Sequence, residues 1–309
     1  MRLGLDIGGT KTAAAIVRDD GTVAALCTAR SGYGPRQVVQ VAAALARQAI
    51  AETGSIRPAS AGACMPGLVE PSTGMVRHAV NLGVTGLNLA VELEAELGYA
   101  VAVENDVKAA ALGADQLMAA RTGLRGPGTG LYRATTHRTL AYLNIGTGLA
   151  AAVVRDGEVL RGLDGVVGEI GHLPMGGDAR CKCGQTGCLE TLASGSALDR
   201  LWAQPRGRDP FAAGAAGDEQ AAAAARVLCT GIALSLQLLV LTTGADRIVL
   251  GGGLVALGPA LRDGIRSELD RRADSSEFVS SLGLAERFEL LPSDVPVAAL
   301  GAALLPHHT

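Results

Sequence analysis

The chain has 309 residues, of which 48% are hydrophobic and 18% charged, and its formal net charge is −3. At about 100 to 200 residues per domain, this length predicts two lobes. The composition argues against disorder, and we expect no membrane span because no apolar run approaches the ~20 residues that one needs. Since 27 basic residues stand against 30 acidic ones without a basic stretch, nucleic acid is not an expected partner. We expect a soluble protein with small-molecule partners.

The first residues and the cysteines indicate the compartment. The N-terminus lacks the basic start, long apolar run and cleavage site of a signal peptide, which predicts a cytoplasmic protein. Three of the six cysteines stand alone in apolar surroundings, where a buried thiol is expected, whereas Cys181, Cys183 and Cys188 are clustered. Only this cluster needs a chemical explanation.

The first part of the chain alternates between strand and helix patterns. It begins with three strands joined by turns at Gly8-Gly9-Thr10 and at Asp19-Asp20-Gly21. The predicted strands are residues 1–6, 12–17, 22–28, 61–65 and 100–103, and the predicted helices are 37–52, 89–97 and 107–117. This alternation is typical of an α/β protein.

The second part of the chain repeats that plan. Residues 121–138 carry Gly, Pro and Arg without periodicity and are predicted to form a surface loop. Strands follow at 140–144, 148–155, 158–160 and 247–250, with helices at 221–241, 262–272 and 297–305. Because the three strands after the loop match the order of the first thirty residues, we expect both lobes to share one plan.

Three glycine turns at strand ends indicate a nucleotide site. In the first, Asp6 precedes Gly8, Gly9, Thr10 and Lys11, so backbone N–H groups could bind phosphate while Asp6 holds Mg²⁺. A plain hairpin turn is the alternative for this motif alone. The other two turns are Gly146-Thr147-Gly148 and Gly251-Gly252-Gly253, the latter open to a flat ligand such as a nucleoside.

Two polar groups between a predicted strand and helix could serve a reaction. Asp106 could be a general base that accepts the proton of an attacking hydroxyl, and Asn105 could orient the same substrate. The alternative is that the carboxylate caps the helix that follows.

His172 and the clustered cysteines form a zinc-ligand set. Cys181, Cys183, Cys188 and His172 supply one imidazole and three thiolates, which suits a closed, tetrahedral and therefore structural zinc site. Free thiols are the alternative, and a disulfide fits less well because three sulfurs leave one unpaired. Zinc here would fix Glu169 and other polar side chains around a pocket.

Taken together, these motifs resemble the ROK family of sugar kinases and sugar-responsive repressors. The matching segments are DIGGTK at 6–11, MPGLVEPSTG at 65–74, ENDVKAAALGA at 104–114, the GTG turn, GEIGH with CKCGQTGCLE, and LGGGL at 250–254. The resemblance implies the α/β, two-lobed, actin-like ATPase (ribonuclease H-like) fold with a cleft between the lobes. It implies a small N-terminal lobe at 1–107, to which the last helix at 297–309 returns, and a large lobe at 108–296 with the zinc-binding loop.

The resemblance also implies roles for individual residues. Asp106 would be the catalytic base that removes the proton of a sugar 6-hydroxyl as it attacks the γ-phosphate of ATP. The sugar would be bound by Gly67, Asn105, Asp106, Glu169, His172 and Glu190. Gly8 to Lys11 and Gly146 to Gly148 would be phosphate loops, Asp6 would lie near Mg²⁺, and Gly252 and Gly253 would belong to the adenosine site. One ring nitrogen of His172 would bind zinc and the other would face the sugar.

The chain departs from the family pattern in three places. Lys108 stands where many members carry Asn; we predict a solvated helix residue, the alternative being a change in the charge of the cleft. The loop at 121–138 is longer than usual and could contact a partner subunit, and the stretch between Gly195 and Ala221 is shortened.

Relatives are commonly dimers or tetramers, so a homodimer or homotetramer is expected.

The expected activity is ATP-dependent phosphorylation of the 6-hydroxyl of a hexose, with glucose as the default substrate. Kanosamine, N-acetylglucosamine and N-acetylmannosamine are alternative substrates. A sugar-sensing regulator without turnover is the alternative from another class. Such regulators carry an N-terminal winged helix-turn-helix, for which DIGGTK at residue 6 leaves no room, so the kinase is favoured.

Overall fold

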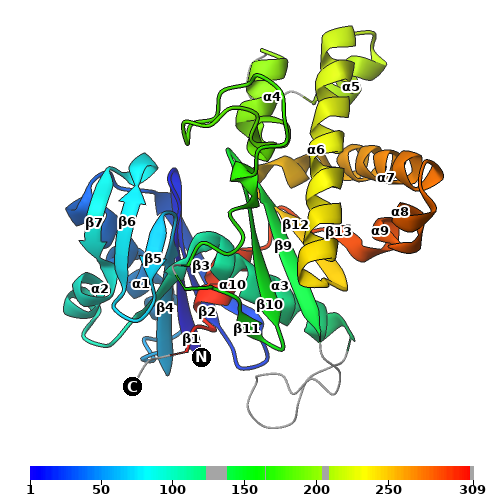
Figure 1. Ribbon diagram of the computed structural model, residues 1–309. Coiled ribbons are helices and arrows are strands. Elements are labelled where there is room, and N and C mark those ends of the chain that lie inside the picture. The colour runs from blue at the N-terminus through cyan, green and yellow to red at the C-terminus, as the bar shows by residue number, and fades with distance from the viewer. Residues whose placement is uncertain (123–137, 164, 204–208, 307–309) are drawn as a thin grey trace. The chain divides into compact units, whose positions relative to one another are not determined.

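The structure is a computed structural model that describes residues 1–122, 138–163, 165–203 and 209–306 (Figure 1). The chain forms two compact units. Unit 1 comprises Met1–His137, Val154–Val166 and Pro296–Thr309, and unit 2 comprises Arg138–Val153 and Val167–Val295. Most of the predicted loop at 121–138, residues 123–137, lies outside the described residues, as do residues 204–208 of the stretch between Gly195 and Ala221.

A five-stranded sheet with the order β3-β2-β1-β4-β8 forms the centre of unit 1. Its strands are β1 (Arg2–Ile7), β2 (Lys11–Val17), β3 (Val23–Arg30), β4 (Ser60–Met65) and β8 (Ala102–Asn105). The first three are antiparallel neighbours, which confirms the predicted three-stranded start, and β1, β4 and β8 run parallel. The turn between β2 and β3 suits its residues, because Gly21 has a positive φ of 84° and the Asp20 carboxylate accepts a hydrogen bond from the Thr22 N–H.

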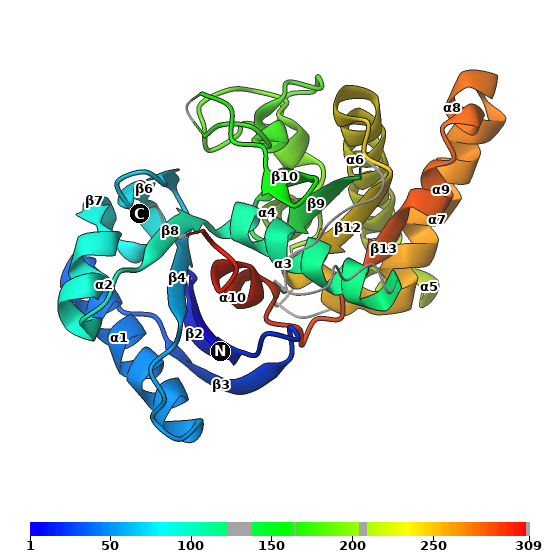
Figure 2. The same cartoon turned by 90° about the horizontal axis from the view of Figure 1, so that it is seen from below.

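The two faces of this sheet pack differently because side chains alternate along β1. Leu3, Leu5 and Ile7 are fully buried in the core that α1 (Pro35–Glu52) and α2 (Leu89–Leu97) complete. On the other face a Cβ at Gly4 would meet the carbonyl oxygen of Ala299 in α10 (Val297–Ala302). Glycine therefore lets the C-terminal helix lie directly on the strands, as Figure 2 shows.

Helix α3 (Asp106–Thr122) packs on α10 through two glycines. A Cβ at Gly113 would meet the Val297 carbonyl, and one at Gly301 would meet the Ala109 carbonyl. Because this packing is so close, α3 groups with unit 1, whereas the lobe boundary implied by the family resemblance lies after residue 107.

A three-stranded sheet in unit 1 has no counterpart in the sequence prediction. It consists of β5 (Leu68–Glu70), β6 (Met75–Ala79) and β7 (Val84–Asn88), with the 3-10 helix η1 (Val80–Leu82) before β7. The strands are too short to show a periodicity in the sequence. Their antiparallel register places Gly67 just before β5, close to the end of β6.

The second five-stranded sheet has the order β11-β10-β9-β12-β13. Its strands are β9 (Thr139–Ile145), β10 (Leu149–Arg155), β11 (Glu158–Val159), β12 (Arg247–Gly251) and β13 (Phe288–Leu290). Counted in chain order within each large sheet, the strands follow the same sequence in both: third, second, first, fourth, fifth. The predicted common plan is therefore confirmed at the level of sheet topology.

Helices of unit 2 cover this sheet, and the longest of them, α6 (Glu219–Thr243), is its core helix. Among the described helices α6 alone is long and apolar enough to cross a membrane, against the expectation that no such segment exists. However, 61% of its apolar window is buried, and Leu228, Ile232 and Leu236 lie on one buried face. A stripe at this spacing is typical of packing inside a protein.

Several short elements of unit 2 escaped the sequence prediction. Helix α7 (Gly258–Asp274) contains the predicted segment 262–272, and the 3-10 helix η4 (Gly253–Leu257) precedes it. The other unpredicted elements are η2 (Ile170–His172), η3 (Leu189–Thr191), α4 (Gly195–Leu201), α5 (Pro210–Ala215), α8 (Glu277–Ser281) and α9 (Leu284–Arg287).

Candidate active site

The parallel strands of unit 1 bring acidic side chains together at one edge of the sheet. In the register, Asp6 of β1 lies beside Cys64 of β4, which in turn lies beside Glu104 of β8. Asp106 follows two residues later as the first residue of α3. Since parallel strands end at a common edge, Asp6 and Asp106 are close enough to interact electrostatically.

Asp6 is poorly suited to carry a charge by itself. Its pKa is raised from 3.8 to about 7, first by burial and second by the negative charge of Asp106. The Cys64 thiol donates to Asp6 Oδ1 over 3.8 Å, and this contact and the Lys11 ammonium lower the pKa in part. A cation placed between the two carboxylates would relieve their repulsion, and carboxylate oxygens are ligands that Mg²⁺ prefers. These residues therefore fit a magnesium ion.

Asn105 shapes the corner between β8 and α3. Its Oδ1 accepts hydrogen bonds from the N–H groups of Val107 (3.0 Å) and Lys108 (3.2 Å), so Asn105 caps α3. Its Nδ2 donates to the Gly67 carbonyl over 3.2 Å. Two of the predicted sugar-binding residues are thus in direct contact. The cap that the sequence analysis considered for Asp106 is largely supplied by its neighbour.

Lys108 corrects a sequence-based expectation. We predicted a solvated helix residue, but its side chain is only 4% exposed and Nζ donates to the Gly165 carbonyl over 2.7 Å. The expectation was wrong because helix periodicity does not reveal a partner 57 residues away in sequence. A buried ammonium needs such a partner.

The turn between β1 and β2 is held by a serine that sequence reasoning missed. Gly8 donates its N–H to the Lys11 carbonyl, and the Ser31 hydroxyl donates to the Gly8 carbonyl over 2.6 Å and contacts Thr12 Oγ1 over 2.9 Å. Gly9, Thr10 and Lys11 are exposed. The backbone groups of Gly8 are thus held by hydrogen bonds while the next three residues are exposed to solvent, an arrangement that suits a phosphate loop.

In unit 2 the turn Gly146-Thr147-Gly148 lies against Glu190. Glu190 Oε2 accepts a hydrogen bond from the Leu149 N–H over 2.9 Å, and a Cβ at Gly148 would meet the same oxygen. Gly195 at the start of α4 donates to the Gly146 carbonyl over 2.8 Å. The structure thus joins a predicted phosphate turn to a predicted sugar-binding glutamate.

The three glycines after β12 have different roles. A Cβ at Gly251 would meet the Tyr142 hydroxyl, and one at Gly252 would lie 2.7 Å from the Ile145 carbonyl group, at a φ of 88°. Both are required by the close approach of β9. Gly253 is exposed and nothing lies within 4 Å of its Cβ position, so of these three residues it is the one open to a ligand.

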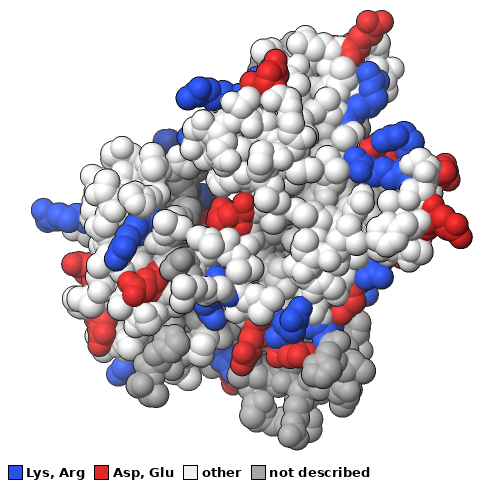
Figure 3. All heavy atoms as spheres, viewed as in Figure 1, with Lys and Arg blue, Asp and Glu red and all other residues white. Residues whose placement is uncertain are grey.

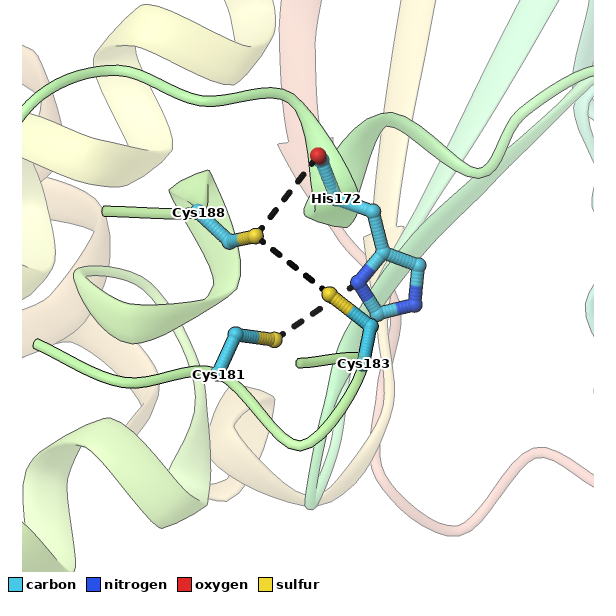
Figure 4. A group of neighbouring side chains, drawn as sticks. All are labelled: His172, Cys181, Cys183 and Cys188. Atoms are coloured by element: carbon cyan, nitrogen blue, oxygen red, sulfur yellow. Dashed lines mark hydrogen bonds between the residues drawn. The ribbon is translucent and has the colours of Figure 1, made fainter. Parts of the chain in front are cut away.

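The predicted zinc ligands come together in unit 2. One ligand atom from each of His172, Cys181, Cys183 and Cys188 lies within 4.8 Å of the others. The three sulfurs and Nδ1 of His172 face a common centre, while Nε2 points away (Figure 4). Cys181 Sγ is 3.7 Å from Nδ1, and Cys183 Sγ is 3.6 Å from Cys188 Sγ.

These distances fit a tetrahedral metal ion. With metal–sulfur bonds of about 2.3 Å, the edge of a regular tetrahedron is about 3.8 Å. The sulfurs of Cys183 and Cys188, which are 3.6 Å apart, are too distant for a disulfide bond. Hydrogen bonds from Gln185 lower the pKa of the Cys183 thiol to about 6, which favours the thiolate that a metal binds, whereas burial raises the pKa of the Cys181 and Cys188 thiols. The site therefore has the donors and the spacing for zinc.

Glu169, the remaining predicted sugar-binding residue, is exposed at the start of η2, three residues before His172. Cys181 Sγ also lies 3.8 Å from Glu190 Oε1, so the metal-ligand cluster and Glu190 are neighbours.

On the face seen in Figure 3, acidic and basic side chains are interspersed.

Comparison with known proteins identifies the family. The model of the ROK family matches residues 2–307. The chain belongs to the ROK family. It is 31% identical over 246 residues to the glucokinase of Halalkalibacterium halodurans, a match that covers 71% of this chain and 70% of the relative.

Two solved structures of ROK proteins share the fold over nearly the whole chain. The ROK hexokinase of Thermus thermophilus has a TM-score of 0.76 and 30% identity, covering 98% of this chain and 96% of the other. A ROK glucokinase of Streptomyces griseus, determined with glucose and AMPPNP, has a TM-score of 0.73 and 26% identity, covering 98% and 97%. The predicted α/β fold of the two-lobed actin-like ATPase class is confirmed.

Proposed function

We propose that this chain, a sugar kinase of the ROK family, transfers the γ-phosphoryl group of MgATP to the 6-hydroxyl of glucose. The observation that carries the proposal is the meeting of Asp6 and Asp106 at the edge of the unit 1 sheet. Paired carboxylates suit phosphoryl transfer, in which one binds the metal and the other accepts the proton of the nucleophile. The similarity to hexokinase and glucokinase chains supports the same reaction.

Asp106 is the general base of the proposed reaction. Its carboxylate takes the proton of the 6-hydroxyl while the hydroxyl oxygen attacks the γ-phosphorus, and the bond from that phosphorus to the bridging oxygen of ADP breaks. Asn105 holds the start of α3, and with it Asp106, in a fixed position, and also binds Gly67. The base is thus supported by a rigid corner.

The nucleotide is proposed to lie against the exposed backbone of the glycine turns. Gly8, Gly9, Thr10 and Lys11 face the phosphates, Gly146, Thr147 and Gly148 form the second turn, and Gly252 and Gly253 contribute to the adenosine site. Mg²⁺, held near Asp6, would neutralise charge on the phosphates. Lys11 adds a positive charge from the protein itself.

The sugar is proposed to bind Glu169, His172 and Glu190 in addition to Asn105 and Asp106. Zinc, when bound to the three thiolates and His172 Nδ1, would cross-link the loop that carries these residues. His172 Nε2 then faces away from the metal and remains available for a sugar hydroxyl. If zinc bound the Cys181 thiolate, this sulfur would no longer donate a hydrogen bond to Glu190 Oε1, which would leave that oxygen available for a sugar hydroxyl as well.

The test is an ADP-release assay with MgATP and a panel of sugars, with the product identified by phosphorus NMR. The panel contains glucose, mannose, fructose, glucosamine, kanosamine, N-acetylglucosamine and N-acetylmannosamine. We expect the highest kcat/KM for glucose and a 6-phosphate product. A preference for an amino or N-acetylamino sugar would keep the kinase and replace its substrate. Sugar binding without turnover of any sugar would refute the kinase in favour of a sugar-sensing regulator.

The compartment and the assembly follow from the same proposal. Three thiols that must stay reduced to bind a metal suit the cytoplasm. A homodimer or homotetramer is proposed in line with the family.

A further inference from the structure

The chain that follows β11 is attached to the β8–α3 corner at two points within unit 1. At the first, Lys108 Nζ donates to the Gly165 carbonyl over 2.7 Å from a side chain that is 4% exposed. Removing an ammonium from water is costly unless it is hydrogen-bonded. The hydrogen bond to the Gly165 carbonyl therefore stabilises the ammonium in this buried position.

At the second point Arg161 pairs with Glu104. Arg161 Nε is 2.7 Å from Glu104 Oε2, and the exposed fractions of the two side chains are 34% and 2%. Glu104 Oε1 accepts a hydrogen bond from the Asn105 N–H over 2.9 Å. The Glu104 carboxylate is thus almost fully buried. Its two oxygens link Arg161 to Asn105, the residue that caps α3. A buried carboxylate without its cation would be strongly destabilised, so this pair is also a firm attachment.

The two attachments lie just before the chain passes from unit 1 into unit 2. The second segment of unit 1 ends at Val166, and unit 2 resumes at Val167. The next residue, Gly168, is bound to β10, since its carbonyl accepts from the Ala151 N–H over 2.8 Å and a Cβ would meet the Ala151 carbonyl. Only Val166 and Val167 separate the Gly165 carbonyl from Gly168, and Glu169 follows directly.

We propose that Lys108 and Arg161 are positioning residues for sugar binding, an inference that rests on the proposed function because it takes Glu169 and His172 as sugar-binding residues. Lys108 holds Gly165, and Glu104 holds Arg161, at the corner that carries Asp106. Only Val166 and Val167 then lie between this anchored chain and Gly168, which precedes Glu169. Fewer conformations are then lost when one sugar engages Asp106 and Glu169 together. The residues proposed to bind ATP belong to the turns after β1, β9 and β12 and not to this connection, so we expect the restraint to act mainly on sugar binding.

The test compares Lys108→Met, Lys108→Arg and Arg161→Met with the wild type. Lys108→Met keeps the length of the chain but cannot donate to Gly165, whereas Lys108→Arg retains a cation that can. Arg47→Met is a matched control, since Arg47 also forms a 2.7 Å pair with a glutamate, Glu96, but on the exposed surface of unit 1. The measurements are the calorimetric Kd for glucose without nucleotide, the KM values for sugar and MgATP, zinc content and Tm.

We expect Lys108→Met and Arg161→Met to weaken glucose binding about five- to tenfold, the size of one lost hydrogen bond. The KM for MgATP and the zinc content should stay at the wild-type level. Lys108→Arg should recover most of the affinity, and Arg47→Met should change none of these quantities. Unchanged sugar affinity in both Met variants would overturn the proposal. So would a joint loss of sugar and MgATP binding with a lowered Tm, because it would indicate a general structural role.

The calorimetric readout separates this inference from the proposed function. If the wild type binds glucose but does not phosphorylate it, the proposed reaction fails while the effect of Lys108 on binding is still measured. If the wild type binds another sugar of the panel instead, the same titrations are made with that sugar.

Discussion

In unit 1 the proposed catalytic residues stand at the ends of hydrogen-bonded strands and at the start of a capped helix, whereas in unit 2 the proposed sugar-binding residues stand in a loop. Asp6 and Asp106 are positioned by the register of β1, β4 and β8 and by the Asn105 cap. Between Val167 and Ser194, unit 2 has only the short helices η2 and η3 and two isolated bridges. Backbone hydrogen bonds and the Asn105 cap hold the first group, whereas the second group surrounds a Cys₃His cluster that could bind a metal ion.

This difference predicts different effects for substitutions in the two units. A substitution at the strand ends removes a chemical group and leaves its support in place, because the support is backbone. If zinc binds as proposed, substituting one of its ligands in the loop of unit 2 would remove the support itself, because the metal would order the loop. The largest effect on rate should therefore come from unit 1, and the largest linked losses should come from unit 2.

The strongest expected effect is that of Asp106→Asn. Removing a general base typically costs 10² to 10⁴ in rate, so we expect kcat to fall about 10³-fold with a Tm close to that of the wild type. Steady-state kinetics and thermal unfolding measure the two quantities. Asp199→Asn, at an exposed position on α4, is the control and should keep full activity. Turnover within tenfold of the wild type would remove Asp106 from the role of base.

The next effect tests the proposal that a metal ion orders the loop of unit 2. Cys183→Ser should lose the zinc measured by mass spectrometry and weaken sugar binding at least about tenfold, while the Kd for MgATP stays unchanged. Cys27→Ser is a matched control, because the serine hydroxyl can keep the contact that Cys27 Sγ makes with Glu52. A zinc-free variant with wild-type affinity for the sugar would contradict the view that metal orders this half.

The same contrast explains what the sequence could predict. The long elements were visible because their periodicity extends over several residues, and α2 was predicted with its bounds, Leu89–Leu97. The strands β5 to β7 include polar residues or glycine and lack the continuous apolar run at 100–103 by which the equally short β8 was predicted. The helices α4, α5, α8 and α9 are too short to show a helical period. The Cys/His cluster could be predicted because three of its four residues are close in sequence.

The supporting residues were not visible, since each acts through a partner far along the chain. Ser31 reaches Gly8, Lys108 reaches Gly165 and Arg161 reaches Glu104. Their residue types alone favour solvent, so burial and pairing emerge only from the fold. The glycines Gly113 and Gly301 are similar, because their need for a small side chain comes from the contact of α3 with α10.

The smallest expected effect is on the pH dependence of the free energy of unfolding. It measures the electrostatic cost of holding Asp6 and Asp106 close together at the strand ends. The fold holds Asp6 in a place that raises its pKa from 3.8 to about 7, by burial and by Asp106. Between pH 4 and pH 7 the unfolded chain releases the Asp6 proton while the folded protein keeps it. The folded state therefore loses stability relative to the unfolded state as pH rises through this window, and the contribution is constant below and above it.

Urea unfolding without magnesium or nucleotide at pH 5, 6, 7 and 8 measures this dependence. Asp6→Asn removes the titrating group and keeps the shape, so the free energy of unfolding of the variant should gain on that of the wild type between pH 5 and 7, by about 2 kcal/mol or less. Titrating groups that do not interact with Asp6 are common to both proteins, so their contributions cancel in the difference. Asp106→Asn should bring the midpoint of the wild-type slope to lower pH, since it removes the negative charge that helps to raise the pKa of Asp6. Parallel curves for the wild type and Asp6→Asn would mean that Asp6 is ionised throughout, and that the strand ends hold the two carboxylates without this electrostatic cost.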